Sequence, residues 1–369
     1  MKLTIERKAL VGVLGQVVGV LPARAALPVL LYVSIGAGFR KLAVRGTDLE
    51  VTAQAEAATD ISEDGSVCVP GKKLFDLVRA FADEPLTLAT AAEGKDRTLT
   101  VTQGRARVRL SGLDSGEFPI SAPVEEKARF EVVAGVLREA VDRVKCAVVI
   151  DESRPSLSGI RFVVAGGVMT AVATDTRRLP IYTAALPNAT GEAAFTLPLK
   201  AAGLLKSLWP GEGSVSVVCG DKVAVFAGGG ASLTCQLIDG AFPDYTRVIP
   251  ADDTLVRVEL PRAEFTAALR RAAQIVRAGK RVVTVQFAPG QVVLTGETSG
   301  VGDVREEVAT AYNGEPLEVV FNPDYLLDGV AGITGEQFVF AVNRNAEKPS
   351  VLSATEGRDY RYLVMPMRV

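Results

Sequence analysis

Apolar and polar residues alternate in three stretches of the chain, each broken by a turn that contains glycine. The stretches are RTLTVTQGRARVRLSG (97–112), SVSVVCGDKVAVFAGG (214–229) and VTVQFAPGQVVLTGE (283–297). A period of two places successive side chains on opposite faces of a strand. Each stretch therefore predicts an antiparallel hairpin with one buried face and one face in water.

A period near 3.6 predicts helices between these stretches. Val136, Leu137, Ala140, Val141 and Val144 follow i, i+3, i+4 spacing, as in an amphipathic helix that packs one side on a sheet. Prolines mark the starts of further helices, where the N–H that proline lacks would have no partner. These prolines are Pro70, Pro198, Pro261 and Pro323.

The strand and helix patterns recur along the chain. LTIERKALVGVL (3–14) is matched at 130–141 and 258–269, and the prolines at 70, 198 and 323 are 128 and 125 residues apart. The first repeat also matches itself, since Ile5 and Lys8 lie 64 residues before Val69 and Lys72. Such periodicity indicates repeated structural units. We predict an α+β protein built from three similar domains with antiparallel sheets, at 1–124, 125–253 and 254–369.

Composition narrows the class of protein. The 369 residues are 48% hydrophobic, 23% charged and 6% aromatic, as in ordinary globular proteins. No apolar run reaches the ~18 residues of a membrane helix, and the charged start MKLTIERKAL is unlike a signal peptide, so we expect a cytoplasmic protein. The four cysteines form no CxxC pair, which predicts neither a disulfide framework nor a thiolate metal site.

Candidate catalytic groups are few. The chain has no histidine, the commonest general base and a frequent metal ligand. VCVPGKKLF (67–75) departs from a phosphate-binding loop in its glycine spacing and in having Lys73 where Ser or Thr is required. Asp151 and Glu152 are adjacent and fit a solvated turn better than an acid–base pair. An enzyme would have to work with Asp, Glu, Lys or Tyr.

Net charge and local charge point to different conclusions about nucleic-acid binding. The net charge of −2 does not predict a generally basic surface, yet basic residues cluster on predicted helices. They are Lys72, Lys73 and Arg79; Arg138, Arg143 and Lys145; Lys200 and Lys206; and Arg270, Arg271 and Arg277. A charged helix face is usually only solvated, and Asp324 and Asp328 on the last helix oppose a nucleic-acid role. The basic patches add up only if the repeats close into a ring with these helices inward.

Four segments carry a specific resemblance. They are RPSLSG (154–159), VATDTRRL (172–179), FPDYTRVIP (242–250) and VMPMR (364–368). In these segments and in its three repeats, the chain resembles the bacterial DNA sliding clamp family, the beta subunit of the DNA polymerase III holoenzyme.

The resemblance implies a head-to-tail homodimer that forms a ring, with sheets outside and helices lining a central hole around duplex DNA. Such a protein catalyses nothing and needs no cofactor or metal. It slides on double-stranded DNA without sequence preference and acts as a processivity factor. Its expected partners are the replicative DNA polymerase alpha subunit, the clamp loader, and other polymerases and repair proteins that carry short linear motifs. A closed ring holds DNA by topology, so weak phosphate contacts suffice and a net negative charge is no obstacle.

Family motif positions also indicate the residues of each site. The expected DNA-binding residues are Arg24, Lys72, Lys73, Arg154 and Lys200, with Lys206, Arg138 and Arg143 added from helix charge. The expected peptide-binding groove between the second and third domains is formed by Leu157, Thr174, Thr176, Arg177, Arg178, Leu179, Pro243, Arg247, Val248, Ser350, Leu363, Met365, Pro366, Met367 and Arg368. The expected dimer contact joins Val108 and Leu110 to Gln274 and Ile275 of the other subunit, although Val108 equally fits an ordinary core position.

The chain departs from the family at one edge of the groove. Family members often have Gly and His where this chain has Thr176 and Arg177. Arg177 predicts a preference for partner peptides with an acidic residue at that edge. The two methionines near the C-terminus, Met365 and Met367, suit a groove that accepts several partners, because their side chains are flexible and polarizable.

Two other classes of protein compete with this interpretation. A repetitive ligand-binding or scaffold protein without a DNA role would explain the repeats and the missing histidine, but not the match at VMPMR. An enzyme that uses only Asp, Glu, Lys or Tyr is the third hypothesis. Retention on circular but not linear DNA distinguishes the ring from both.

Overall fold

The computed structural model describes residues 1–93, 96–120, 123–151, 153–187, 189, 191–357 and 359–368. Contacts divide the chain into two compact units. Unit 1 comprises Met1–Arg138 and Asn188–Leu237, and unit 2 comprises Glu139–Pro187 and Ile238–Val369. Helix α3 (Ala134–Val144) begins in the first and ends in the second. Among the described residues, no helix has the length and apolar character needed to cross a membrane.

Unit 1 contains two antiparallel sheets. The smaller has the order β5-β1-β7-β8-β9 and the larger the order β10-β15-β16-β17-β4-β3-β2-β6. The strands of unit 1 are β1 (Lys2–Glu6), β2 (Tyr32–Gly38), β3 (Lys41–Thr47), β4 (Val51–Ala58), β5 (Asp60–Glu63), β6 (Gly65–Pro70), β7 (Pro85–Glu93), β8 (Asp96–Gln103), β9 (Ala106–Gly112), β10 (Ala128–Val133), β14 (Ala193–Pro198), β15 (Ser214–Cys219), β16 (Val223–Gly228) and β17 (Ala231–Gln236). Its helices are α1 (Arg7–Val17), α2 (Gly71–Ala80) and α4 (Leu199–Leu208).

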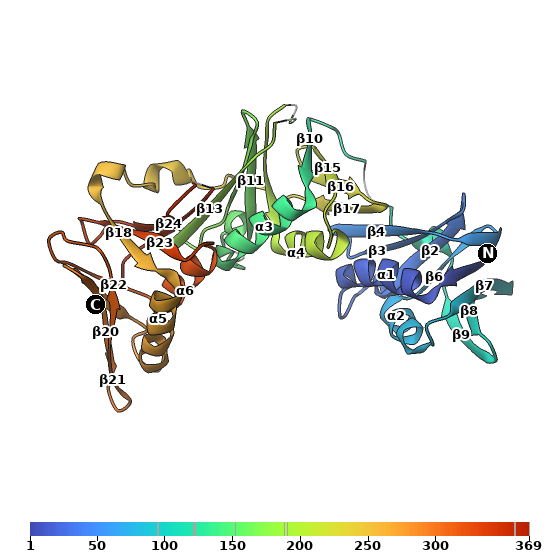
Figure 1. The fold of residues 1–369 in the computed structure, drawn as a ribbon. Helices are drawn as coiled ribbons and strands as arrows, with labels where there is room; N and C mark the ends of the chain where they lie inside the picture. The colour runs from blue at the N-terminus through green and yellow to red at the C-terminus, as the bar shows by residue number, and fades with distance from the viewer. Residues whose placement is uncertain are drawn as a thin grey trace. The chain divides into compact units, whose positions relative to one another are not determined.

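Helices cover one face of the larger sheet in unit 1. Alternate residues of β4 are buried, beginning with Val51 and Ala53. Helix α1 packs on β3 and β4, and α4 packs on β17 (Figure 1). The buried side of α1 includes Leu10 and Leu14, which are fully inaccessible. The opposite face of the sheet carries the polar residues of the alternating pattern.

Unit 2 also contains two antiparallel sheets. In the first, the strands that belong to unit 2 have the order β11-β12-β13-β25-β24-β23-β18, and the second has the order β21-β20-β19-β22. The strands of unit 2 are β11 (Gly159–Ala165), β12 (Val168–Val172), β13 (Arg178–Ala185), β18 (Leu255–Pro261), β19 (Val283–Ala288), β20 (Gln291–Thr298), β21 (Gly302–Ala309), β22 (Leu317–Phe321), β23 (Gln337–Asn343), β24 (Ser350–Ala354) and β25 (Tyr360–Val364). Helices α5 (Arg262–Val276) and α6 (Pro323–Ala331) pack against each other, and α5 also packs on β20 and β21 (Figure 1).

The predicted elements are confirmed where the pattern was local. The three alternating stretches form the hairpins β8–β9, β15–β16 and β19–β20. Pro70, Pro198 and Pro261 are the N-cap residues of α2, α4 and α5, and Pro323 is the first residue of α6. The α+β class with antiparallel sheets is therefore confirmed.

The two units do not follow the predicted domain boundaries. Strands from neighbouring predicted domains pair within one sheet: β17 pairs with β4 in unit 1, and β13 pairs with β25 in unit 2. The second predicted domain, 125–253, is consequently shared between the units. The boundaries at 124 and 253 stay a prediction.

Candidate functional site

The loop between β12 and β13 forms a tightly hydrogen-bonded turn. The Thr174 hydroxyl donates to the carbonyl oxygen of Arg178 at 2.8 Å and accepts from the Thr176 N–H at 3.0 Å. The Asp175 carboxylate accepts from the N–H groups of Arg177 and Arg178, both at 2.9 Å. Side chains thus replace the missing backbone ladder at this bend. Thr176 has φ 74°, a left-handed conformation that is strained for a β-branched residue.

Arg178 attaches this turn to helix α6. Its Nε donates to Asp175 at 2.9 Å and its Nη1 to Asp328 of α6. The guanidinium also lies over the ring of Tyr325, 4.6 Å from the centroid. The side chains of Arg178 and Asp175 are only 14% and 10% exposed, so this pair is largely shielded from water, whereas Asp328 is 44% exposed. Arg178 positions the turn more than it offers a charge to a ligand.

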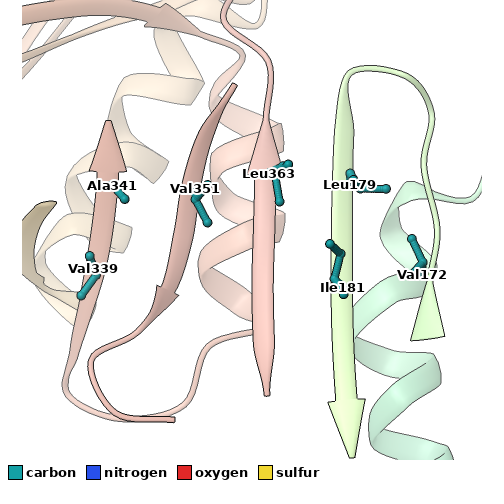
Figure 2. Packing of buried hydrophobic residues seen from close by; sticks show 7 residues of the cluster. All are labelled: Val172, Leu179, Ile181, Val339, Ala341, Val351 and Leu363. Carbon is teal, nitrogen blue, oxygen red and sulfur yellow. The ribbon is translucent and has the colours of Figure 1, made fainter. Parts of the chain in front are cut away.

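A cluster of buried apolar side chains lies beside the turn (Figure 2). Leu179 of β13 and Leu363 of β25 are directly opposite in the strand register, so their side chains share one face of the sheet. The cluster consists of Val172, Leu179, Ile181, Val339, Ala341, Val351 and Leu363, and it is flanked by the partly buried residues Phe242, Tyr245, Ile249 and Leu255. This cluster forms an apolar floor.

A pocket of about 220 Å³ opens above this floor. Nine predicted groove residues line it: Thr174, Thr176, Arg177, Arg178, Leu179, Pro243, Val248, Leu363 and Met365. Three lining residues were not predicted, Asp244, Tyr245 and Pro349. Asp244 and Tyr245 belong to the FPDY segment used for the resemblance, and Pro349 precedes the predicted Ser350. The position of each residue near a predicted groove residue in the sequence could have indicated that it lines the pocket.

Two titratable groups in the pocket wall have shifted pKa values. Burial raises the pKa of the Tyr245 hydroxyl, and Arg161 and Arg361 nearby oppose that shift. The pKa of Asp244 is lowered, chiefly because it accepts a hydrogen bond from the Thr246 hydroxyl at 2.6 Å, with Arg247 contributing. The wall therefore presents a neutral phenol and a carboxylate at neutral pH.

The remaining predicted groove residues do not line this pocket. Leu157 and Ser350 are buried, with exposures of 3% and 1%, and the Ser350 hydroxyl accepts from the Asn343 N–H. Arg247 lines a neighbouring cavity of about 700 Å³ that shares Val248, Pro349 and Met365 with the pocket. The predicted peptide contacts of all these residues stay untested.

The C-terminal segment is attached to the body of unit 2. The N–H of Met365 donates to the Arg177 carbonyl at 2.8 Å, and the N–H of Met367 donates to the Val320 carbonyl at 2.7 Å. Pro366 lies between these two anchored residues, and Arg368 is 86% exposed and pairs with Glu347 at 3.3 Å. Backbone hydrogen bonds therefore hold Met365 in place at the rim of the pocket.

The predicted DNA-binding residues fall into two groups. Arg24, Lys72 and Lys73 are exposed. Four others are already engaged: Lys200 donates to Asp48 and to the Val20 carbonyl, Arg154 pairs with Asp151, Arg138 pairs with Glu212, and the half-buried Lys206 also has a partner. The first group offers its charges directly to solvent, and the second group would have to exchange partners to contact phosphate.

Arg143, which helix charge alone predicted to bind DNA, makes its contacts within the protein. Its side chain is 9% exposed and pairs with Glu139 at 2.5 Å and Asp359 at 2.9 Å. The guanidinium lies 5.1 Å from the ring centroid of Tyr182 and 5.5 Å from that of Tyr360. Burial, followed by the hydrogen bond to Glu139, raises the pKa of Tyr182. The contact of Arg143 with DNA stays a prediction. Helix charge did not indicate these intramolecular partners, because both tyrosines come from strands distant in sequence.

The predicted dimer-contact residues lie at accessible positions. Val108 and Leu110 are half-buried on β9, which is an edge strand of its sheet. Gln274 is exposed and Ile275 half-buried on α5. The ordinary-core alternative for Val108 is not supported, since β9 has no fully buried residue.

Acidic and metal-binding candidates give no catalytic arrangement. The pKa of Asp151 is lowered to about 2 by hydrogen bonds from the Ser153 hydroxyl and from Arg154, which fits the predicted turn. Glu152 lies outside the described residues. Within the part of the chain that the structure describes, no group of three or more His, Cys, Asp or Glu side chains is suited to hold a metal ion.

Comparisons with known proteins agree along the whole chain. Models of the N-terminal, central and C-terminal domains of the DNA polymerase III beta subunit match residues 1–122, 131–244 and 246–368. The beta sliding clamp of Caulobacter vibrioides is 33% identical over 375 residues, and that of Pseudomonas aeruginosa is 31% identical over 373, with both chains covered completely.

Solved structures show the same likeness. A Pseudomonas aeruginosa sliding clamp bound to griselimycin has a TM-score of 0.94 at 30% identity, with 100% of both chains covered. The beta subunit of Thermotoga maritima has a TM-score of 0.90 at 25% identity, covering 100% of this chain and 99% of that one. The fold extends over all three matched domains.

Proposed function

Because the chain belongs to the bacterial sliding clamp family, the beta subunit of DNA polymerase III, it is a non-catalytic processivity factor, and we propose that the unit 2 pocket is where it holds its partners. The replicative polymerase alpha subunit, the clamp loader, and other polymerases and repair proteins would each insert a short extended motif. The location that fits this role is the cytoplasm, where the chromosome is replicated.

The pocket carries the proposal because its chemistry suits an extended apolar peptide. The floor at Leu179 and Leu363 is buried and apolar, and Met365 at the rim can adapt to different side chains. Arg177 is exposed beside Met365, whose N–H donates to the Arg177 carbonyl, and its side chain would attract an acidic residue of the motif. Such a site combines buried apolar area with a few charged groups, Arg177 and Asp244 among them, that give specificity.

A direct binding assay tests this role of the pocket. A fluorescein-labelled peptide from the polymerase alpha subunit of the same genome is titrated with the full chain, and griselimycin, which a Pseudomonas aeruginosa relative binds, serves as the competitor. We expect Met365→Ala to weaken binding about tenfold, which corresponds to about 1.4 kcal/mol. Val301→Ala, at a 55% exposed position on the β20–β21 turn, is the control and should bind normally. Equal affinity of the two variants would refute the assignment.

DNA contact by this chain would be weak and independent of sequence. We propose that Arg24, Lys72 and Lys73 make the first phosphate contacts, since they are exposed, and that the ring itself prevents release. On a nicked plasmid with a cognate loader and ATP, the protein should stay on circles and leave after linearisation. Equal retention on both forms would contradict the topological model. Lys72→Ala should reduce the salt dependence of binding by about one phosphate contact.

We propose that the ring closes by pairing of strand edges between two subunits. The β9 edge carries the exposed residues Arg107 and Arg109 next to Val108. The edge strand β21 carries Asp303, Glu306 and Glu307 with one basic residue, Arg305, which pairs with Glu307. Opposite charge and open N–H and C=O groups make the two edges complementary in a head-to-tail dimer. Gln274 and Ile275 of α5, the helix that packs on β21, would complete the contact. Arg107→Glu should shift sedimentation toward the monomer, and an unchanged dimer would exclude β9.

A further inference from the structure

Unit 1 contains a second copy of the turn that borders the unit 2 pocket. The Thr47 hydroxyl donates to the Val51 carbonyl at 3.0 Å and accepts from the Leu49 N–H at 3.1 Å. The Asp48 carboxylate accepts from the N–H groups of Glu50 at 3.0 Å and Val51 at 2.7 Å. Leu49 has φ 80°. Each bond has its counterpart in the turn from Thr174 to Arg178.

Each turn is also tied to a helix of its own unit, although from different positions. Asp48 pairs with Lys200 of α4, whereas Arg178, whose counterpart in the unit 1 turn is Val51, pairs with Asp328 of α6. The next strand also matches, because Cys235 of β17 lies opposite Val51 in the register, just as Val364 lies opposite Arg178. Internal repetition has therefore built the framework of the partner pocket twice in one chain.

A cavity of about 440 Å³ lies over the unit 1 copy. Pro119 and Ile120 stand after Phe118 here, as Pro243 stands after Phe242 at the unit 2 pocket. Ile120 is 89% exposed and Leu49 is 49% exposed. Two large apolar side chains at the mouth of a cavity leave area that a ligand would bury.

The chemistry of the two pockets differs. By register, Thr234 and Gln236 occupy the positions of Leu363 and Met365, so the floor is polar where the other is apolar. Glu50 occupies the position of Arg177, and Lys222 stands on the far side of β17. A ligand of the unit 1 pocket must therefore differ in charge and polarity from a ligand of the unit 2 pocket.

The positions of the two charges suggest the spacing of the ligand. Glu50 precedes β4 and Lys222 precedes β16, and both of these strands pair with β17. The Gln236 N–H donates to the Glu50 carbonyl and the Leu237 N–H to the Lys222 carbonyl, so both charges lie level with the end of β17. Two strand spacings separate their backbones by about 10 Å, which is about three residues of a peptide in the polyproline II conformation, where side chains i and i+3 lie on the same side.

We propose that unit 1 carries a second peptide-binding site, at Glu50, Ile120 and Lys222, for a segment of a partner protein in the polyproline II conformation, with an apolar side chain between a basic and an acidic residue three positions apart. The basic residue pairs with Glu50, the acidic residue with Lys222, and the apolar side chain covers Ile120. The site is independent of the unit 2 pocket and selects a different motif.

Methyl NMR of the full chain tests the proposal. Isoleucine δ1 methyl groups are labelled with ¹³C, so that Ile120 reports on unit 1 and Ile249, which flanks the apolar cluster, reports on unit 2. The probe is the blocked tetrapeptide Arg-Leu-Ala-Asp, with Arg-Leu-Ala-Arg and Asp-Leu-Ala-Asp as like-charged controls. We expect a saturable shift at Ile120 with the mixed-charge peptide, at least fivefold tighter than with either control.

A charge reversal makes the outcome specific. Glu50→Lys changes an exposed side chain and should make Asp-Leu-Ala-Asp the tightest of the three peptides at Ile120. The absence of a saturable shift at Ile120, equal shifts with all three peptides, or an unchanged preference in Glu50→Lys would each overturn the proposal. The polymerase peptide, read at Ile249 in the same sample, tests the unit 2 pocket separately, so failure of one site is distinguishable from failure of the other.

Discussion

Replacing Arg143 should destabilise unit 2 without changing how well the protein is retained on DNA. The guanidinium is nearly excluded from water between the rings of Tyr182 and Tyr360, and it pairs with Glu139 and Asp359. Arg143→Met keeps the length and apolar stem of the side chain but removes the charge and the planar group. The substitution therefore isolates the contribution of the guanidinium.

The size of the effect follows from the four contacts. Two cation–π contacts contribute about 0.5–1 kcal/mol each. The partners Glu139 and Asp359 are 43% and 48% exposed, so each ion pair adds only about 0–1 kcal/mol because water can take over. Together these contacts give about 2 kcal/mol, which lowers the melting temperature of a unit of this size by about 4–8 °C.

Differential scanning calorimetry and loading onto nicked plasmid DNA distinguish the two roles of Arg143. Arg143→Lys is the matched control, since it keeps the charge but loses the planar stacking, and it should give a smaller loss of stability. A melting temperature within 1 °C of the parent chain, combined with a loss of DNA retention like that of Lys72→Ala, would refute the structural role and restore the DNA-binding one.

Three further predictions concern stability and reactivity. Gly329→Ala in α6 should lower the free energy of unfolding in urea by about 1–3 kcal/mol, because the new Cβ would stand 2.6 Å from the ring of Tyr362 and 2.7 Å from Leu352. Gly203→Ala in α4, where nothing lies within 4 Å of the new Cβ, should raise the free energy of unfolding by about 0.5–1 kcal/mol. A decrease at both sites would contradict the packing argument. Thr176→Gly should raise the stability of unit 2 by about 1 kcal/mol by relieving the left-handed backbone, and a decrease measured by the same unfolding assay would show that the turn depends on the threonine side chain. Burial raises the pKa of Cys68 and Cys146 to about 11 and of Cys219 and Cys235 to about 12. A thiol reagent at pH 8 should therefore label the native chain slowly, and it should label all four cysteines quickly after denaturation. Rapid labelling of the native protein would contradict this prediction.

Local patterns in the sequence were enough to predict the hairpins and helix starts. Alternation along β8 and β9 depends only on neighbouring residues and on the turn at Gly104, which has φ 55°. A proline at a helix start acts through its own ring. Such features need no knowledge of distant segments, so the chain alone is sufficient to read them.

Features that depend on distant segments were not predictable in the same way. Leu179 and Leu363 meet only because β13 pairs with β25, and the sequence indicates neither that partner nor its register. Lys200 was placed among the DNA-facing residues by its motif, whereas Asp48 holds it in the folded chain. The resemblance supplied positions at the pocket, but Tyr245 and Pro349 show that lining a cavity depends on side-chain direction as well as position.

The pairing of β13 with β25 also affects how the protein is made. A ribosome produces β25 roughly 180 residues after β13, which takes about 10–40 s at ordinary rates of translation. During that interval β13 has an open edge, and Leu179 and Ile181 lack the neighbours that cover them in the finished fold. A chain released before β25 is synthesised has no wall at Leu363 and Met365, so an unfinished product cannot compete with the finished one for the polymerase.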